Sequence, residues 1–232
     1  IPVLAAMERT GIELDVVYLR TMQRELEDSI SDLEQTIYGF AGKEFNISSP
    51  QQLAEVLFTD LGLPSHGIKK GKTGFSTAAS ELAKLVSYHP IIPIISEYRE
   101  YTKLKSTYVD TLPNQVGPDG RVHTTFNLTI AQTGRLSSTD PNLQNIPVRT
   151  EIGKKIRHAF VAKKGHSFVS ADYSQFELRL AAVLAGDIDM IEAFNSGADI
   201  HTRTAAEVYG VALDDVTPQM RSNAKTINFG VL

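Results

Sequence analysis

Residues 169–179 constrain the fold more than any other stretch, because they join a short apolar run to a helical pattern. The apolar run at residues 167–171 predicts a buried strand. Asp172 therefore lies where a strand gives way to a turn, and a carboxylate there can hold a divalent cation. It can equally cap the following helix, and the spacing alone does not separate the two interpretations. The helical pattern has apolar residues three and four apart, namely Phe176, Leu180, Val183 and Leu184.

Composition narrows the class of protein. The 232 residues allow one large domain or two small ones, and an apolar content of 42% is enough for a sizeable core. The absence of Cys excludes disulfides and thiolate metal sites. No apolar run is long enough to span a bilayer and no signal peptide is visible, so no membrane partner is expected. The net charge of −4 argues mildly against a chain that is basic all over.

Positive charge is nevertheless concentrated in two places. Residues 149–164 carry six Lys and Arg against a single acid, Glu151, and a smaller run is formed by Lys69, Lys70 and Lys72. A solvated surface is the commoner meaning of such runs, but both can also contact phosphates. The smaller run lies in a loop rich in Gly and Lys, residues 64–77, which fits a flexible connection or a brace for a duplex backbone.

The first half of the chain is predicted to be helical from its apolar spacing and cap residues. A strand should follow at residues 122–130, where apolar and polar residues alternate. The expected helices cover residues 15–40 with Asp15 as N-cap, residues 50–61 after a Ser-Ser-Pro start, residues 77–86 with Thr77 as cap, and residues 91–112.

Residues 131–149 are unusually polar for their length and nearly uncharged. Their forked donors and acceptors suit the minor groove, whose acceptors are similar for all base pairs. A long loop that hydrogen-bonds to itself is the alternative. The side chains concerned are Arg135, Asn142, Gln144, Asn145 and Arg149.

The last third should contain short helices at residues 188–195 and 200–209, and a final helix with Thr217 as N-cap and proline behind it. On the final helix Arg221, Lys225 and Phe229 lie four residues apart, on one face. Two cations and an aromatic ring in one line can hold a polyphosphate with a base stacked at its end. A solvated cationic face with a buried Phe has the same spacing.

Three ordered stretches closely resemble the family A DNA polymerases, of the bacterial DNA polymerase I type. They are Thr-Gly-Arg-Leu-Ser-Ser with Asp-Pro-Asn-Leu-Gln-Asn-Ile-Pro at 133–147, Asp-Tyr-Ser-Gln-Phe-Glu-Leu-Arg at 172–179, and Arg221 with Lys-Thr-Ile-Asn-Phe-Gly at 225–230. The resemblance covers nearly the whole chain. It implies an α+β right-hand polymerase fold in part: a helical thumb (1–112), part of an antiparallel-sheet palm (113–185) and the start of helical fingers (186–232).

The resemblance also implies a reaction. A primer 3′-hydroxyl would attack the α-phosphate of a dNTP, with two Mg²⁺ ions stabilising the attacking and leaving oxygens. Asp172 would be a metal ligand through its carboxylate and Tyr173 through its carbonyl oxygen. Arg221, Lys225 and His201 would neutralise the triphosphate.

Specificity and template contacts are implied in the same way. Phe229 would lie against the sugar and base, Glu177 would close the space beside the 2′ position, and Gln175 is assigned to the same nucleotide site. A 2′-hydroxyl would then clash with Glu177. Primer and template would be held, largely without regard to sequence, by Lys105, Arg135, Asn142, Gln144 and Arg149.

The departures from the family pattern matter as well. The family's second catalytic carboxylate belongs to a His-Asp-Glu motif that these 232 residues lack, so we expect the chain alone to be inactive until the remaining C-terminal part is supplied, in the same chain or as a second polypeptide. Phe176 stands where the family usually has Ile. Two alternatives are a noncatalytic DNA-binding fragment and a single-subunit RNA polymerase, and Glu177 argues against the second. A bacterial cytoplasmic or viral setting is expected, with an organelle not excluded.

Overall fold

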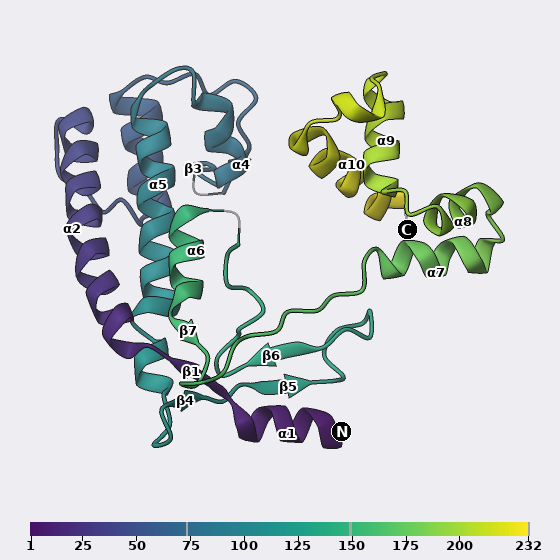
Figure 1. Cartoon of the computed structure of the whole chain (residues 1–232). Coiled ribbons are helices and arrows are strands. Elements are labelled where there is room, and N and C mark those ends of the chain that lie inside the picture. Colours follow the sequence, from purple (N-terminus) through teal and green to yellow (C-terminus); the bar gives the residue numbers. More distant parts are fainter. Residues whose placement is uncertain (73, 149, 232) are drawn as a thin grey trace. The chain divides into compact units, whose positions relative to one another are not determined.

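The computed structural model describes residues 1–72, 74–148 and 150–231, with only the backbone at 231, and the chain divides into two compact units (Figure 1). The N-terminal unit is Ile1–Phe168 and the C-terminal unit is Val169–Leu232. None of the helices in the described residues is both long and apolar enough to cross a membrane.

Helix α2 (Val16–Ala41) is the long axis of the N-terminal unit and packs along α5 (Ile91–Leu104) (Figure 1). It begins as the sequence predicts, because the Asp15 side chain accepts a hydrogen bond from the backbone N–H of Tyr18 at 2.8 Å. It ends at Gly42, which adopts the left-handed conformation. The other helical segments of this unit are α1 (Pro2–Thr10), α3 (Pro50–Glu55), η1 (Val56–Asp60), α4 (Ala79–Leu82), η2 (Ala83–Leu85), η3 (Lys105–Val109), η4 (Leu112–Gln115) and α6 (Glu151–His158).

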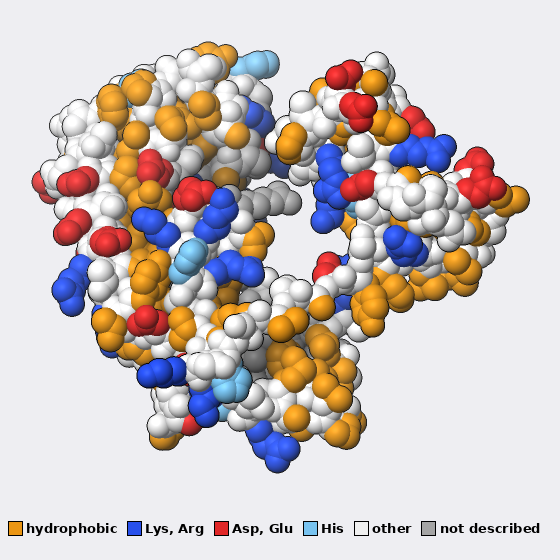
Figure 2. Space-filling model, in the orientation of Figure 1, with side chains coloured by type: hydrophobic (Ala, Val, Ile, Leu, Met, Phe, Trp, Pro, Cys, Tyr) orange, Lys and Arg blue, Asp and Glu red, His pale blue; other side chains and the backbone are white. Residues whose placement is uncertain are grey.

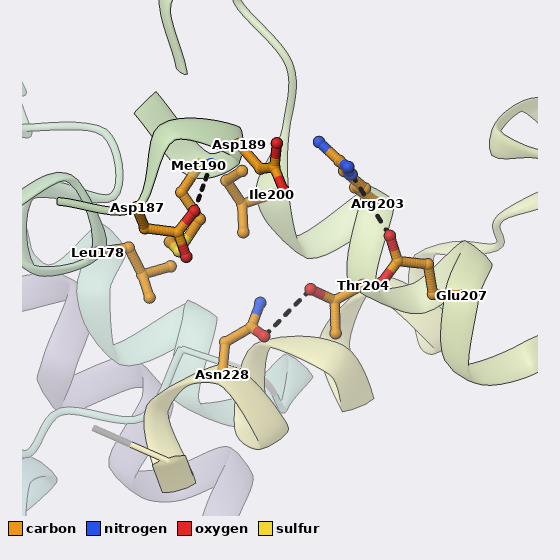
Figure 3. Close-up of a pocket in the computed structure, with 9 residues that line it drawn as sticks. All are labelled: Leu178, Asp187, Asp189, Met190, Ile200, Arg203, Thr204, Glu207 and Asn228. Carbon is orange, nitrogen blue, oxygen red and sulfur yellow. Dashed lines mark hydrogen bonds and ion pairs between the residues drawn. The ribbon is translucent and has the colours of Figure 1, made fainter. Parts of the chain in front are cut away.

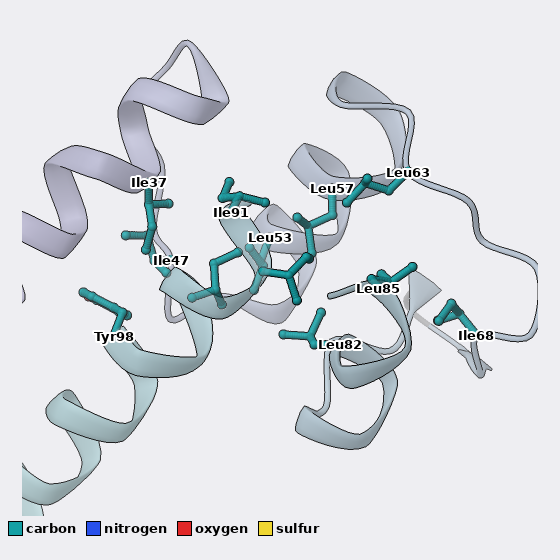
Figure 4. Packing of buried hydrophobic residues seen from close by; sticks show 12 residues of the cluster. Ile37, Ile47, Leu53, Leu57, Leu63, Ile68, Leu82, Leu85, Ile91 and Tyr98 are labelled. Atoms are coloured by element: carbon teal, nitrogen blue, oxygen red, sulfur yellow. The ribbon is translucent and has the colours of Figure 1, made fainter. Parts of the chain in front are cut away.

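Two hydrophobic clusters fill this unit. The first joins the C-terminal half of α2 to α3, α4 and α5, and Figure 4 shows its interlocking side chains, among them Ile37, Leu53 and Ile91. The second lies around the N-terminal half of α2 and includes Leu19 and Leu112, both fully buried. The apolar spacing that predicts these helices therefore marks the buried faces of the N-terminal unit.

In the described residues, three small antiparallel sheets accompany the helices. In the largest, β1 lies between β4 and β7, with Ile12 opposite Val122 and Leu14 opposite Phe160. In the second, β5 pairs with β6 so that Phe126 faces Ser138. The strands are β1 (Ile12–Leu14), β2 (Lys70–Gly71), β3 (Gly74–Phe75), β4 (Arg121–Val122), β5 (Thr125–Asn127), β6 (Ser137–Thr139) and β7 (Phe160–Val161).

The strand predicted at residues 122–130 is interrupted and ends early. At the interruption, the His123 ring bonds to the Glu8 carbonyl oxygen at 2.7 Å, and the buried Thr124 hydroxyl approaches the carbonyl oxygens of Thr139 and Pro141 at 3.0 and 2.7 Å. These side-chain bonds connect the segment to α1, to the end of β6 and to the loop after it, and the predicted strand divides into β4 and β5.

The strand predicted at residues 167–171 is wrong. Phe168 and Val169 are 59% and 91% exposed, and no strand in the described parts of the chain pairs with this segment. Apolar spacing alone cannot make a strand, because its backbone groups need a neighbouring strand to bond to.

Two further details differ from expectation. Thr77 does not cap α4, whose N-cap residue is Ala78; instead the Arg99 guanidinium binds the Thr77 carbonyl oxygen and approaches its hydroxyl at 3.2 Å. The loop rich in Gly and Lys contains a short hairpin, β2 with β3, in which the Lys70 ammonium lies 5.4 Å from the centre of the Phe75 ring.

The C-terminal unit consists of helices and turns. The predicted cap Thr217 is confirmed, since its side chain accepts from the backbone N–H of Met220 at 3.2 Å. Asp187 caps α8 in the same way and accepts from the backbone N–H of Met190 at 2.9 Å. Its core is a small cluster that includes Leu178, Phe194 and Ile200. The helical segments are α7 (Phe176–Ala185), α8 (Ile188–Asn195), α9 (Ile200–Tyr209), η5 (Leu213–Asp215) and α10 (Pro218–Val231).

The apolar stripe that predicts α7 is not the side of the helix that is buried. Leu178 and Ala182, four residues apart, face the core of the unit. The stripe of Phe176, Leu180, Val183 and Leu184 is between 47% and 78% exposed, and Figure 2 shows it as hydrophobic surface along α7.

Candidate active site

A cavity of about 450 Å³ opens in the C-terminal unit between the turn before α7, α9 and α10. All the residues predicted for catalysis, metal binding and nucleotide binding line it, although they are spread over residues 172–229. The lining residues are Asp172, Tyr173, Ser174, Gln175, Phe176, Glu177, His201, Arg221, Lys225 and Phe229.

The acidic side of the cavity comes from the turn and the first residues of α7. Gln175, the N-cap residue of α7, has the left-handed backbone conformation with φ 55°, which redirects the chain into the helix. Asp172 lies three residues earlier, is exposed, and does not cap α7, which has no side-chain cap. The capping interpretation of Asp172 is therefore excluded, and its carboxylate faces the cavity together with Glu177.

The cationic side of the cavity comes from α10. Arg221, Lys225 and Phe229 share one face of this helix, as their spacing predicts. Arg221 donates from Nε and Nη2 to Asp199 Oδ2 at 2.9 and 2.6 Å. Lys225 is exposed and makes no ion pair within the described residues. Phe229 is 38% exposed, so it is not the buried Phe of the alternative interpretation.

His201 is buried, with 2% of its surface exposed. The Thr204 hydroxyl donates to Asn228 Oδ1 at 3.1 Å, which leaves the Asn228 Nδ2 group to donate to His201 Nδ1 at 2.9 Å. This arrangement places the ring proton on Nε2. Burial lowers the pKa of His201, the Asp199 charge opposes that shift, and the charges of Arg221 and Lys225 add to it. His201 is therefore a neutral donor at neutral pH.

A second cavity of about 360 Å³ is lined by residues of α7, α8, α9 and α10, the last through Asn228 (Figure 3). Asp187, Asp189 and Glu207 contribute three carboxylates to its wall, and Arg203 is paired with one of them, Glu207, at 3.4 Å. Such a wall repels a polyphosphate, so the cavity with Arg221 and Lys225 is the candidate active site.

The residues predicted to hold primer and template lie in the N-terminal unit. Lys105 is the least accessible: its ammonium contacts Asp110 at 2.9 Å and Glu27 at 3.1 Å, with 18% of the side chain exposed. Arg135, Asn142 and Gln144 are exposed in the polar stretch around β6. Arg149 lies outside the described residues.

The polar stretch is an ordered, partly self-bonded loop. Its first part forms β6, and the Asn142 side-chain oxygen accepts from the backbone N–H of Gln144 at 3.0 Å. The Tyr108 hydroxyl donates to the carbonyl oxygen of Asn145 at 2.6 Å and fixes the loop to η3. The interpretation as a self-bonded loop is therefore confirmed in part. Gln144 and Arg135 lie at the surface, and their contact with a minor groove stays a prediction.

The donor atoms of the cavity limit how Mg²⁺ can be held. The described residues contain no cluster of three or more His, Asp or Glu side chains that could hold a metal ion. Mg²⁺ often takes only one or two carboxylates and completes its shell with water and substrate phosphate. The exposed Asp172 carboxylate and the neighbouring Tyr173 carbonyl fit that kind of site and do not by themselves fit two ions.

Sequence reasoning missed two residues of the site. Asp199 binds Arg221, and Asn228 fixes the His201 ring, yet neither was singled out. Asp199 could have been found as an N-cap before α9, because its side chain accepts from the backbone N–H groups of His201 and Thr202. Its pairing with Arg221, which follows 22 residues later, has no local signal.

The cavity therefore combines an acidic turn, a cationic helix face, an aromatic ring and a neutral His, which are side-chain types that can contact a nucleotide polyphosphate. Comparisons with known proteins then give the family. The family model for DNA polymerase family A matches residues 16–232, and the chain belongs to that family.

Individual relatives agree. The chain is 54% identical over 232 residues to the thermostable DNA polymerase I of Thermus aquaticus, covering 99% of this chain and 28% of the relative. It is 50% identical to DNA polymerase I of Bacillus subtilis, covering 99% of this chain and 26% of the relative. The chain thus spans about a quarter of the length of these relatives.

A solved structure shows the fold. The polymerase domain of Pol1 from M. smegmatis, in complex with a DNA primer-template and dNTP, superposes with a TM-score of 0.88 at 46% identity, covering 98% of this chain and 40% of that one. The fold is therefore part of a right-hand polymerase fold of the α+β class.

Proposed function

We propose that this chain is the portion of a template-directed DNA polymerase that binds the incoming dNTP and part of the primer–template. The observation that carries the proposal is the cavity in which Asp172 and Glu177 face Arg221, Lys225 and Phe229. Family membership supports it. In this assignment residues 1–112 are the thumb, 113–185 part of the palm and 186–232 the start of the fingers.

The cations act on the triphosphate. Arg221 and Lys225 donate charge-assisted hydrogen bonds to its oxygens and neutralise charge that moves toward the leaving pyrophosphate. His201 adds a donor from Nε2 without adding charge, because Asn228 occupies Nδ1. Phe229, whose ring centre is 5.7 Å from that of His201, lies against the sugar and base.

The acidic side sets metal binding and sugar choice. The Asp172 carboxylate and the Tyr173 carbonyl would hold Mg²⁺, which when bound stabilises charge on the attacking and leaving oxygens. Glu177 excludes a 2′-hydroxyl by volume, and Gln175 shapes the turn between these groups. One metal-binding carboxylate cannot hold two ions. A second metal-binding carboxylate must therefore come from residues outside these 232, and the chain alone does not extend a primer.

Calorimetric titration of the 232-residue chain with dATP and Mg²⁺ tests the nucleotide site separately from catalysis. We expect the wild type to bind and Lys225→Ala to bind about 10- to 100-fold more weakly, since a hydrogen bond to a charged group contributes about 1.5–3 kcal/mol. Arg203→Ala is the control, because Arg203 pairs with Glu207 and lines the other cavity. An unchanged dATP affinity in Lys225→Ala would remove α10 from the nucleotide site.

Primer extension tests the reaction. The chain should extend a primer only when the remainder of the polymerase domain is supplied, and Asp172→Asn should then abolish extension. DNA binding without dATP binding, and without extension in the completed protein, would favour the noncatalytic DNA-binding fragment instead.

A further inference from the structure

Asp199 connects three walls of the candidate active site. Its Oδ2 accepts both hydrogen bonds of the Arg221 fork. Its Oδ1 accepts from the backbone N–H groups of His201 and Thr202, at 2.9 and 3.2 Å, and from the Gln175 side-chain amide at 3.2 Å. One carboxylate thus links the turn before α7, the start of α9 and the cationic face of α10.

Asp199 itself lies outside the cavity lining, although three of its hydrogen-bond partners line the cavity. Arg221, Gln175 and His201 line the cavity, whereas Asp199 does not. Asp199 therefore stands behind the side chains that it holds. A guanidinium has five N–H donors, and Asp199 takes one from Nε and one from Nη2. Three donors of Arg221, two of them on Nη1, are left for another acceptor.

The turn depends on the same carboxylate. Gln175 is in the left-handed region, which is unfavourable for a residue with a side chain. Its amide Nε2 donates to Asp199, while its buried Oε1 has no hydrogen-bond partner in the described parts of the chain. The hydrogen bond to Asp199 therefore orients this amide.

Asp199 remains charged in this setting. Partial burial alone would raise its pKa, but the Arg221 guanidinium and the backbone N–H groups of Thr202 and His201 outweigh burial and lower the pKa below its ordinary value. The carboxylate is therefore a strong acceptor at neutral pH.

We propose that Asp199 is a positioning residue for the dNTP triphosphate: it holds the Arg221 fork from behind, so that the remaining donors of Arg221 meet the phosphates. The proposal rests on the proposed function of this cavity. It makes a prediction of definite sign. Removing a negative charge beside a polyanion site should strengthen binding if only Coulomb attraction mattered. If Asp199 positions Arg221, removing that charge should weaken binding.

Asp199→Asn separates these two effects. Asn is as good an N-cap as Asp, and its side-chain oxygen can still accept from the backbone N–H groups of α9. The Asn side chain has no charge and no second oxygen, so it cannot also accept the two hydrogen bonds of the Arg221 guanidinium. In titrations of the 232-residue chain with dATP and Mg²⁺, we expect the dissociation constant to rise about tenfold. The affinity for inorganic pyrophosphate with Mg²⁺ should fall in parallel.

Two controls keep the result specific. Asp187→Asn changes an N-cap of the same type, on α8, that lines the other cavity and not the candidate active site, and it should leave dATP affinity unchanged. In an Arg221→Ala background, Asp199→Asn should have almost no further effect, because the side chain that it positions is gone. A general loss of structure would instead add to the effect of Arg221→Ala and lower the unfolding temperature.

The outcomes are distinguishable. Tighter or unchanged dATP binding by Asp199→Asn overturns the positioning role. So does a loss of affinity from Asp199→Asn that is as large in the Arg221→Ala background as in the wild type. In either case, weaker dATP binding by Arg221→Ala alone still supports the nucleotide site. If Arg221→Ala also binds dATP like the wild type, the proposed function itself fails.

Discussion

The two units differ in the size of their hydrophobic cores and in the ion pairing of their predicted ligand-binding cations. The N-terminal unit has two large hydrophobic clusters, and its predicted DNA-contacting cation, Lys105, is neutralised by Glu27 and Asp110. The C-terminal unit has one small cluster, an exposed apolar stripe on α7, and a cation, Lys225, with no ion pair in the described residues. Core packing therefore dominates the first unit, whereas the second leaves more of its apolar and cationic side chains exposed.

The largest effect should come from the cores. Leu19 is fully buried in the N-terminal unit, and Leu184 in the C-terminal unit is 78% exposed. Leu19→Ala should reduce the free energy of unfolding by about 2–5 kcal/mol through lost burial and a residual cavity. Leu184→Ala should change it by less than about 0.5 kcal/mol. Urea denaturation followed by circular dichroism measures both, and a similar loss for the two variants would show that the α7 stripe is covered in solution.

Helical glycines give the next effect, with opposite signs in the two units. A Cβ at Gly153 in α6 would lie 2.5 Å from Pro147 Cβ and 2.9 Å from the Pro147 carbonyl oxygen, whereas a Cβ at Gly230 in α10 would meet nothing within 4 Å. Gly153→Ala should destabilise by about 1–3 kcal/mol because backbone must move.

Gly230→Ala is the matched substitution in the other unit. It should be neutral or stabilise the chain by up to about 1 kcal/mol, because alanine favours helix. Thermal unfolding of the two variants side by side provides the measurement. Destabilisation by both would mean that α10 is as closely packed as α6.

How far the sequence predicts the structure also differs between the units. Local signals succeed in both, since a cap residue and its backbone partner are three positions apart, as with Asp15 and Thr217. Strands fail because their partners are remote: residues 167–171 find no neighbouring strand among the described residues. Thr77 is a poor cap for α4 because Arg99, 22 residues away, binds it instead.

The candidate site shows the same limit. The spacing of Arg221, Lys225 and Phe229 places them on one helix face, and the family resemblance adds Asp172 and His201. What neither supplies is the set of contacts between segments, such as the bond from Asn228 to His201 that sets the ring proton. A stripe of apolar residues on α7 indicates a helix but not the side that is buried, because burial depends on what else the chain brings to that helix.

The N-caps should behave alike in the two units, because capping is local. Asp15→Ala on α2 and Asp187→Ala on α8 each remove one acceptor for a backbone N–H. Each should cost about 1 kcal/mol, and Asn at either position should restore most of it. Guanidinium denaturation of the four variants measures this. A much larger loss at Asp187 would mean that this residue supports the unit through more than its cap.

The smallest effects are expected for two histidines whose pKa values are shifted in opposite directions. In the N-terminal unit both ring nitrogens of His123 face acceptors, the Glu8 carbonyl oxygen at 2.7 Å and Asp119 Oδ2 at 3.1 Å. These two hydrogen bonds raise the pKa of His123 above 6.5, and the bond to the Glu8 carbonyl oxygen contributes more than the bond to Asp119. In the C-terminal unit Nδ1 of His201 faces the Asn228 donor, and burial lowers the pKa of His201 below 6.5.

The two shifts act on stability with opposite signs. The stabilisation from His123 is complete below pH 6.5, where the unfolded chain is also protonated, and is lost as the pH rises through the folded pKa. The stabilisation from His201 is present above pH 6.5 and is lost as the pH falls through its folded pKa. Proton NMR titration of the ring Hε1 signals, assigned with His123→Gln and His201→Gln, should give a higher pKa for His123. Equal values would mean that the hydrogen bonds of His123 and the burial of His201 do not persist in solution.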